Sequence, residues 1–117
     1  STMLDKKNRL RKKKEFNYIY KKGNAFFSKY YTLFITSTKL TDKKIGFSVS
    51  NKVGNSVVRH RVKRLMCEVV RKNLNCFPTN NYVFVARPGS ENLDFNQVTD
   101  NIFYLLKKAG LKQKNES

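Results

Sequence analysis

The spacing of apolar residues predicts three helices. Apolar positions recur three and four residues apart, as on one face of an amphipathic helix, over residues 13–22, 56–75 and 95–109. The middle helix follows Gly54, so Asn55 or Ser56 is expected to cap its first turn. The last helix begins with Asp94 three residues before Gln97, which is the spacing of a capping box. The pattern therefore predicts one short helix and two long ones.

Three other stretches have the composition and alternation of β-strands. Residues 30–36 and 82–86 are rich in aromatic and β-branched types, and residues 44–50 alternate between apolar and small polar side chains. The small polar face of residues 44–50 leaves room for something to lie against it. Residues 38–43 are expected to form a hairpin between the first two strands. The order helix, strands, helix, strand, helix predicts an α+β fold, a two-layer α/β sandwich with one small sheet.

Positive charge dominates the composition and indicates a polyanionic partner. The 117 residues include 25 Lys and Arg against 8 acidic residues, a formal net charge of +17. Such a charge repels itself, and nucleic acid or an anionic membrane surface would relieve the repulsion. No run approaches the roughly 20 apolar residues that span a bilayer, and the N-terminus has no apolar signal segment. We therefore expect a cytoplasmic protein that binds nucleic acid.

The length suits one domain, because a single core is comfortable at this size and two would be cramped. We expect residues 1–14 to be a flexible basic arm, residues 15–110 to be a single RNA-binding α/β domain, and residues 111–117 to be a frayed tail. Ser1 and Thr2 are interpreted as remnants of expression and are left out of the functional argument.

The residue types do not favour catalysis or metal binding by the protein itself. Cys67 and Cys76 are expected to be unbridged thiols, and together with His60, the single histidine, they match no common zinc spacing. One histidine offers no acid–base pair. The acidic residues are scattered, without the clustered carboxylates that hold catalytic metal ions. The sequence therefore predicts no catalytic residue and no metal ligand.

The strongest candidate for binding is the helix that follows the glycine loop. Residues 52–71 read KVGNSVVRHRVKRLMCEVVR. At about 100° per residue, one arc of this helix carries Arg59, His60, Lys63, Arg64, Cys67 and Arg71, with Arg61 at its border. Only Glu68 could pair with these cations along the helix, and the glycine lets the backbone approach phosphate closely. A solvated charged face is the alternative, but the pattern favours phosphate binding.

The same segment resembles a known family. KVGNSVVRHRVKR is similar to the signature segment of bacterial ribonuclease P proteins, which typically runs K-x-G-N-A-V-x-R-N-R-x-K-R. The likeness continues in NRLRKKKEFNYIYKKG, IGFSVSNKVGN and VFVAR, and covers the chain from about Arg9 to Arg87. The resemblance implies the order αβββαβα, with an additional strand at residues 24–28, one small mostly antiparallel sheet and a left-handed βαβ crossover.

The resemblance also implies a function. Members of this family are the protein subunit of ribonuclease P, an endoribonuclease whose catalytic centre is in its RNA. The protein binds that RNA and the single-stranded 5′ leader of precursor tRNA, and promotes magnesium-dependent removal of the leader. The implied partners are ribonuclease P RNA and precursor tRNA, without a membrane or an obligate protein partner. The protein alone would bind no cofactor, and Mg²⁺ would act in the RNA-containing holoenzyme.

Site residues follow from the resemblance by position. The RNA subunit would contact the glycine loop and the basic helix at Lys52, Gly54, Asn55, Arg59, His60, Arg61, Lys63 and Arg64. The leader would lie in a cleft formed by Phe16, Tyr20, Phe34, Ser48 and Ser50. Non-specific phosphate contacts are expected from Arg9, Arg11, Lys12, Lys13 and Arg71. Spacing alone favours ordinary core packing for the two aromatics of the first helix, whereas the resemblance favours a leader contact.

The chain departs from the family pattern at four positions, where His60 stands for Asn, Cys67 for Arg, Asn51 for Lys and Phe34 for Tyr. The main alternative is a structural RNA-binding protein of the ribosomal type, which would have the same charge. The signature segment favours the ribonuclease P interpretation. A DNA-binding helix is less favoured, because it is expected to follow a short helix and turn, whereas this basic helix follows a strand.

Overall fold

The computed structural model describes residues 3–111, which form three α-helices and four strands in the order αβββαβα. The helices are α1 (Lys13–Lys22), α2 (Ser56–Lys72) and α3 (Phe95–Lys108). The strands are β1 (Asn24–Phe27), β2 (Tyr31–Thr36), β3 (Lys44–Val49) and β4 (Asn81–Ala86). Short 3₁₀ segments lie at Lys6–Asn8 (η1), Asn51–Val53 (η2), Leu74–Cys76 (η3) and Ser90–Asn92 (η4). The predicted α+β class and element order are confirmed, including the strand that only the family resemblance indicated.

The four strands form one mixed sheet in the order β1-β2-β4-β3. β1 pairs with β2 and β2 with β4 antiparallel, whereas β3 pairs with β4 parallel, so α2 is the crossover between two neighbouring strands. The predicted hairpin between residues 30–36 and 44–50 is wrong, because β4 lies between these two strands. β4 is apolar on both faces, with Val83 and Phe84 fully buried, and the centre of the sheet is where both faces are covered.

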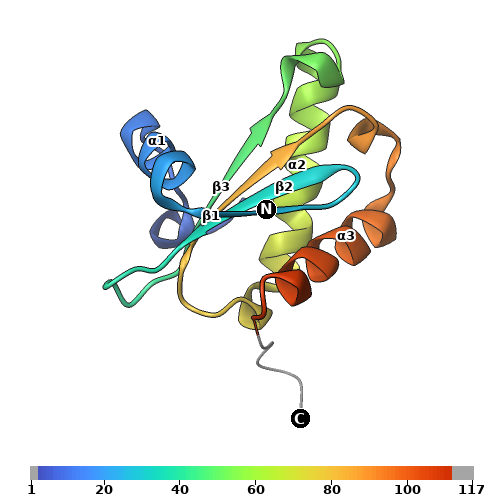
Figure 1. The fold of residues 1–117 in the computed structure, drawn as a ribbon. Helices are drawn as coiled ribbons and strands as arrows, with labels where there is room; N and C mark the ends of the chain where they lie inside the picture. The colour runs from blue at the N-terminus through green and yellow to red at the C-terminus, as the bar shows by residue number, and fades with distance from the viewer. Residues whose placement is uncertain (1–2, 112–117) are drawn as a thin grey trace.

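The helices cover the two faces of the sheet unequally. α2 and α3 pack together over one face and form the main core with Leu33, Phe84, Met66 and Ile102, all fully buried (Figure 1). α1 lies on the opposite face, where Ile19 packs against the other side of β4. Because α1 is short, it covers only part of that face. The remainder is open sheet.

The N-terminal segment, residues 3–10, packs against the edge strand β3. Leu4, Asn8 and Leu10 are all buried, and the backbone N–H of Leu10 donates to the carbonyl oxygen of Ile45 at 3.1 Å. The expected flexible arm over residues 1–14 therefore differs from the structure in its described part. The charge run suggested mobility, but Leu4 before the cations and Leu10 among them are buried against apolar surface and hold the segment in place. Apart from Leu111, the predicted tail at 111–117 lies outside the described residues.

Local signals fix the starts of the two long helices. The side chain of Asn55 accepts a hydrogen bond from the backbone N–H of Val58 at 3.0 Å, which makes Asn55 the cap of α2. At α3 the Asp94 carboxylate accepts from the Gln97 backbone at 2.8 Å, and the Gln97 side chain accepts from the Asp94 backbone at 3.0 Å. The predicted capping box is confirmed. None of the helices within residues 3–111 is long and apolar enough to cross a membrane.

Candidate RNA interface

The outer face of α2 presents a group of exposed cations. Val62, Met66 and Val69 are buried beneath the helix and fix its orientation against the sheet. This packing leaves four cations of α2 exposed, of which Lys72 pairs with Glu68. We name the other three, which lie around the exposed surface of the helix, the cation row: Arg61, Lys63 and Arg64. Within residues 3–111 none of them forms an ion pair. Unpaired cations held at helical spacing are suited to contact a phosphate backbone.

Glu68 does not neutralise the cation row. Its carboxylate lies 3.5 Å from the ammonium group of Lys72, one turn further along the helix, where both side chains remain partly exposed. An exposed pair of this kind contributes little to stability, at most about 1 kcal/mol. His60, which the sequence placed on the same arc, is also exposed. Its ring therefore lies beside the cation row and is accessible to solvent.

Arg59 differs from the other cations of α2, because its guanidinium group is already occupied. Its Nη1 donates to Oδ1 of Asn51 at 2.8 Å, and its Nε donates to the carbonyl oxygen of Gly54 at 3.2 Å. The side chain is half-buried, so Arg59 holds the loop against the first turn of α2. The sequence predicted a direct RNA contact, and the contact to the loop adds a positioning role that helical spacing could not indicate.

The loop before α2 is shaped by short-range contacts. The hydroxyl of Ser50 accepts a hydrogen bond from the backbone N–H of Lys52 at 3.2 Å. A Cβ atom added to Gly54 would lie 3.0 Å from the side chain of Val58, so the absence of a side chain lets the loop close onto the helix. Lys52 and Asn55 are both exposed. Of the predicted loop residues, Lys52 thus presents a charge to solvent, while Gly54 and Asn55 set the geometry.

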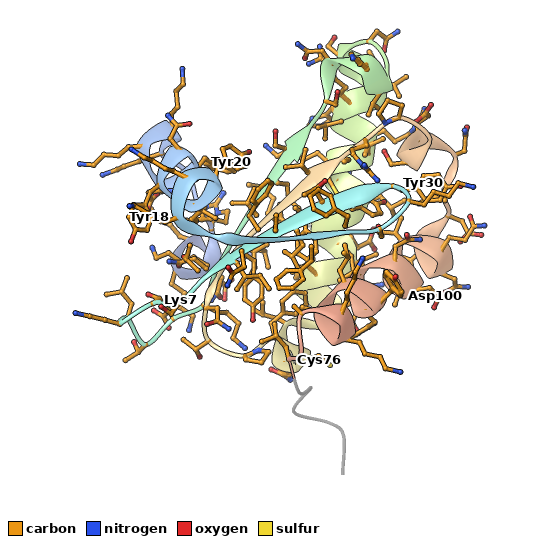
Figure 2. All side chains as sticks on the ribbon, viewed as in Figure 1. Lys7, Tyr18, Tyr20, Tyr30, Cys76 and Asp100 are labelled. Carbon is orange, nitrogen blue, oxygen red and sulfur yellow. The ribbon has the colours of Figure 1, made fainter. Side chains whose placement is uncertain are left out.

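Three aromatic residues meet on the other side of the sheet, and we name them the aromatic cluster: Phe16, Tyr20 and Phe34. The ring of Tyr20 lies 5.1 Å from that of Phe34 in a T-shaped arrangement and 6.3 Å from that of Phe16. Tyr20 is 36% exposed, and the other two rings are half-buried. Figure 2 shows Tyr20 and Tyr18 on different sides of α1. The structure thus brings together the three aromatics of the predicted cleft.

Phe16 also has a packing role. A Cβ atom on Gly46 would lie 2.5 Å from Cζ of Phe16, so the ring sits directly on the backbone of β3. The room that the sequence indicated on the small face of residues 44–50 is therefore partly filled by this ring. Core packing and ligand contact, which the sequence offered as alternatives for Phe16, are both compatible with its position.

Beside α1, a row of side chains crosses the same face of the sheet, from exposed Phe27 through buried Thr32 to half-buried Val85 and Ser48. Strand register aligns Phe27 with Thr32, Thr32 with Val85, and Val85 with Ser48, so these four residues share one face. We name them the open row. Phe27, at its β1 end, is 52% exposed. No functional role was predicted for Phe27. Adjacent Phe26 and Phe27 must point to opposite faces of the strand, however, so only one of the two rings can enter the core.

The remaining predicted residues lie at the edges of these surfaces. Ser48 is half-buried at the β3 end of the open row, and Ser50 follows β3 with its hydroxyl engaged in the loop before α2. Arg11, Lys12 and Lys13 are exposed around the start of α1. Two other predicted phosphate contacts, Arg9 and Arg71, are half-buried with their Nε atoms enclosed.

The two groups with raised pKa values are tyrosines of the core. Burial raises the pKa of Tyr82 to about 12, opposed by a hydrogen bond from Asn80, and burial also raises the pKa of Tyr31. Both phenols lie in the core on the side of α2 and α3, away from the aromatic cluster. No disulfide joins Cys67 and Cys76. Within residues 3–111 no group of three or more His, Cys, Asp or Glu side chains could hold a metal ion.

Comparison with known proteins identifies the family. The family model for Ribonuclease P matches residues 4–110. The chain is 40% identical over 108 residues to a ribonuclease P protein component of Clostridium botulinum, covering 91% of this chain and 97% of that protein. It is 30% identical over 115 residues to one of Bacillus velezensis, covering 97% and 99%.

Solved structures agree with this match. The structure of the Staphylococcus aureus ribonuclease P protein superposes with a TM-score of 0.81 at 25% identity, covering 90% of this chain and 97% of that one. The shared fold and the full-length relatives identify the same family. The chain belongs to the ribonuclease P protein family, whose members are the protein component of the bacterial endoribonuclease that processes the 5′ end of precursor tRNA with ribonuclease P RNA as their partner.

Proposed function

We propose that two separate surfaces of this protein bind two different RNAs in the holoenzyme. The cation row and the loop before α2 bind ribonuclease P RNA, and the aromatic cluster with the open row holds the single-stranded leader of precursor tRNA. The observation that carries the proposal is the chemical difference between these surfaces: exposed, unpaired cations on one, and partly exposed aromatic rings beside small side chains on the other.

Binding of the RNA subunit by α2 is supported by charge and rigidity. A folded RNA presents its phosphates at fixed positions, so cations on a helix that is packed along its whole length meet them with little loss of conformational freedom. Arg61 and Arg64 can each contact two phosphate oxygens through the planar guanidinium fork. Lys52 extends the same charge onto the loop. His60 stands beside them and offers a hydrogen bond.

Binding of the leader by the opposite face is supported by its aromatic rings. Unstacked bases of single-stranded RNA bind where they can stack on aromatic side chains, while cations follow the backbone. Tyr20 and Phe27 both expose a ring surface. Thr32, which is buried next to Phe27, and half-buried Ser48, at the far end of the open row, are both small, so neither obstructs an extended strand of RNA on this face. The exposed cations around the start of α1, such as Arg11, are available for its phosphates.

The protein acts on cleavage indirectly. The catalytic centre and the Mg²⁺ ions belong to the RNA, and the protein alone binds no cofactor. With 25 basic residues against 8 acidic ones, the chain lowers the repulsion between the RNA subunit and its RNA substrate. That reduction favours occupancy of magnesium sites in the RNA. The protein works in the cytoplasm with these two RNAs and needs no other protein.

The direct test is cleavage of a precursor tRNA by transcribed ribonuclease P RNA at low magnesium, with and without this protein, beside a lane with the protein alone. We expect cleavage at the mature 5′ end only when both components are present. A protein that binds RNA tightly without stimulating cleavage would instead belong to the structural RNA-binding class. Cleavage in the lane with protein alone would contradict the assignment of the catalytic centre to RNA.

A further inference from the structure

A cavity of about 310 Å³ lies beside α2, apart from the open row. Four parts of the chain enclose it: the N-terminal segment, the edge strand β3, the middle of α2, and α1 through Phe16. Its apolar side includes Leu10, Ile45 and Phe47. Its volume is at the lower end of the range of about 300–1,000 Å³ that is typical of small-ligand pockets. The space therefore suits one small group, and a whole helix or strand would not enter it.

The charged side of this cavity is entirely basic. Arg9 contributes from the N-terminal segment, Lys63 and Arg64 contribute from α2, and no lining residue is acidic. The Nε atom of Arg9 is buried and makes no hydrogen bond to any residue in the described part of the chain. A buried N–H group without an acceptor is unfavourable, so a ligand with an acceptor atom would be stabilised there. The ligand should thus combine a small apolar part, a hydrogen-bond acceptor and negative charge.

A nucleotide has these three features. Its base is flat and carries ring nitrogens and carbonyl oxygens that accept hydrogen bonds, and its phosphate is anionic. RNA-binding proteins hold unstacked bases against aromatic rings or guanidinium planes. Building on the proposed function, we propose that this cavity takes up one unstacked base of ribonuclease P RNA. The base lies against the apolar wall that includes Leu10 and Phe47, with an edge toward Arg9, and its phosphate contacts Lys63 and Arg64.

The position of the cavity favours the RNA subunit over the leader as the source of this base. Lys63 and Arg64 belong to the cation row and also line the cavity, so an RNA bound along α2 passes its mouth. Phe16 is the one member of the aromatic cluster that also lines the cavity, where its ring sits on Gly46, whereas Tyr20 and Phe34 do not line it. A leader that stacks on Tyr20 therefore lies outside the cavity.

The test fills the cavity without changing its charge. Cys67 lines the cavity and is only half-buried, so Cys67→Phe introduces a ring in the place of the base. We expect affinity for ribonuclease P RNA to fall about tenfold or more, in the range that loss of one stacked base produces. The slope of log Kd against log salt should not change, since no cation is lost. Asn96→Phe is the matched control, because it adds the same ring to an exposed position of α3.

A second arm covers the case in which Cys67→Phe does not fold, as judged by its circular dichroism and melting midpoint. In the native protein the thiol of Cys67 is modified with benzyl methanethiosulfonate, which attaches a neutral benzylthio group through a disulfide bond. Cys76 is buried, so the reagent should react at Cys67 first. Affinity for the RNA should fall on modification and return when a reductant removes the group. An affinity that stays at the unmodified value, with the group shown by mass to be attached, overturns the proposal.

Base-specific probing identifies the nucleotide. Unpaired bases of the RNA subunit are methylated with dimethyl sulfate in the presence of the native protein or of Cys67→Phe. We expect one or two bases to be protected by the native protein and to react again with the variant. A variant that keeps full RNA-subunit affinity but loses affinity for the precursor leader overturns the proposal in favour of a leader base. These failures are distinct from failure of the proposed function, in which the native protein itself would not stimulate cleavage.

Discussion

The outer face of α2 and the open face of the sheet are both candidates to bind RNA, but they are built in different ways. On α2 the side chains that we propose to bind RNA are separate from those that hold the helix, because Arg61 is exposed while the neighbouring Val62 is buried. On the sheet face the same rings pack and are proposed to bind, since Tyr20 packs on Phe34 and is still 36% exposed.

The comparison indicates how each surface should respond to substitution and to salt. Removing a cation from α2 should cost binding energy without costing stability, and the loss should depend on salt because phosphate contacts release counterions. Removing a ring from the aromatic cluster should reduce both binding energy and stability. The loss of binding should depend little on salt because stacking carries no net charge. This contrast can be tested by variants that affect only one surface.

The largest effect is expected from removing the cation row by replacing Arg61, Lys63 and Arg64 together with Ala. Affinity for ribonuclease P RNA should fall by about a hundredfold or more, since a contact to a charged group contributes about 1 kcal/mol or more. The salt slope should decrease by about two to three. Filter binding at several salt concentrations measures both, and the melting midpoint should not change.

A matched control removes three exposed lysines from other parts of the surface: Lys22, Lys39 and Lys107. It lowers the net charge by the same amount, so any general effect of charge on association appears here too. Equal losses in the two triple variants would show that α2 contributes only to overall charge and would remove the distinction between the two surfaces.

The next effect is expected from Tyr20→Ala in the aromatic cluster. Affinity of the holoenzyme for precursor tRNA should fall by about 1–3 kcal/mol, and affinity for mature tRNA should not change. Tyr18→Ala is the matched control, because it removes the same ring from the other side of α1, where Tyr18 is 58% exposed. Equal losses for the two tRNAs would mean that Tyr20 matters for packing and not for the leader.

A smaller effect is expected from Phe27→Ala, which tests how far the leader surface extends. The ring is 52% exposed at the β1 end of the open row, so its loss should cost about 1 kcal/mol of precursor affinity, the lower end of the range for a stacked base. Leu40→Ala is the control, since Leu40 is 60% exposed elsewhere. If Phe27→Ala leaves the affinity unchanged for precursors with leaders of every length tested, the leader surface ends at α1.

The smallest effect is expected from Asn51→Ala, which removes the partner of Arg59 without removing charge. The loop before α2 should lose definition, and affinity for the RNA subunit should fall by about 0.5–1.5 kcal/mol, as for one hydrogen bond. The salt slope should stay constant, which distinguishes positioning from a phosphate contact. A decrease in slope close to one would mean that the variant loses a direct contact of Arg59.

The sequence predicted those features that depend on neighbouring residues. The cap at Asn55 and the capping box at Asp94 are signals read over four residues, and the exposure of Arg61 and Arg64 follows from helical spacing against buried Val62. These features are confirmed because each requires only the local backbone and the presence of a core on one side.

Other features depend on segments far apart in the chain and were not predicted. β4 lies between β2 and β3 because it is apolar on both faces. The length of the linker between β2 and β3 fits a hairpin, and it does not show that β4 pairs with both strands instead. Leu10 reaches the core through a backbone contact with Ile45, which the surrounding charges concealed. Phe27 belongs to a strand of four residues that is too short to recognise from its own pattern.

The central claim is that the two surfaces bind different RNAs, and one comparison tests it most directly. Affinities for ribonuclease P RNA, and for precursor and mature tRNA in the reconstituted holoenzyme, are measured for Tyr20→Ala and for the triple variant of the cation row, with protein added to saturate the RNA. We predict that the triple variant loses RNA-subunit affinity but still prefers precursor to mature tRNA, and that Tyr20→Ala does the reverse. Proportional loss of both properties in both variants would contradict two separate surfaces.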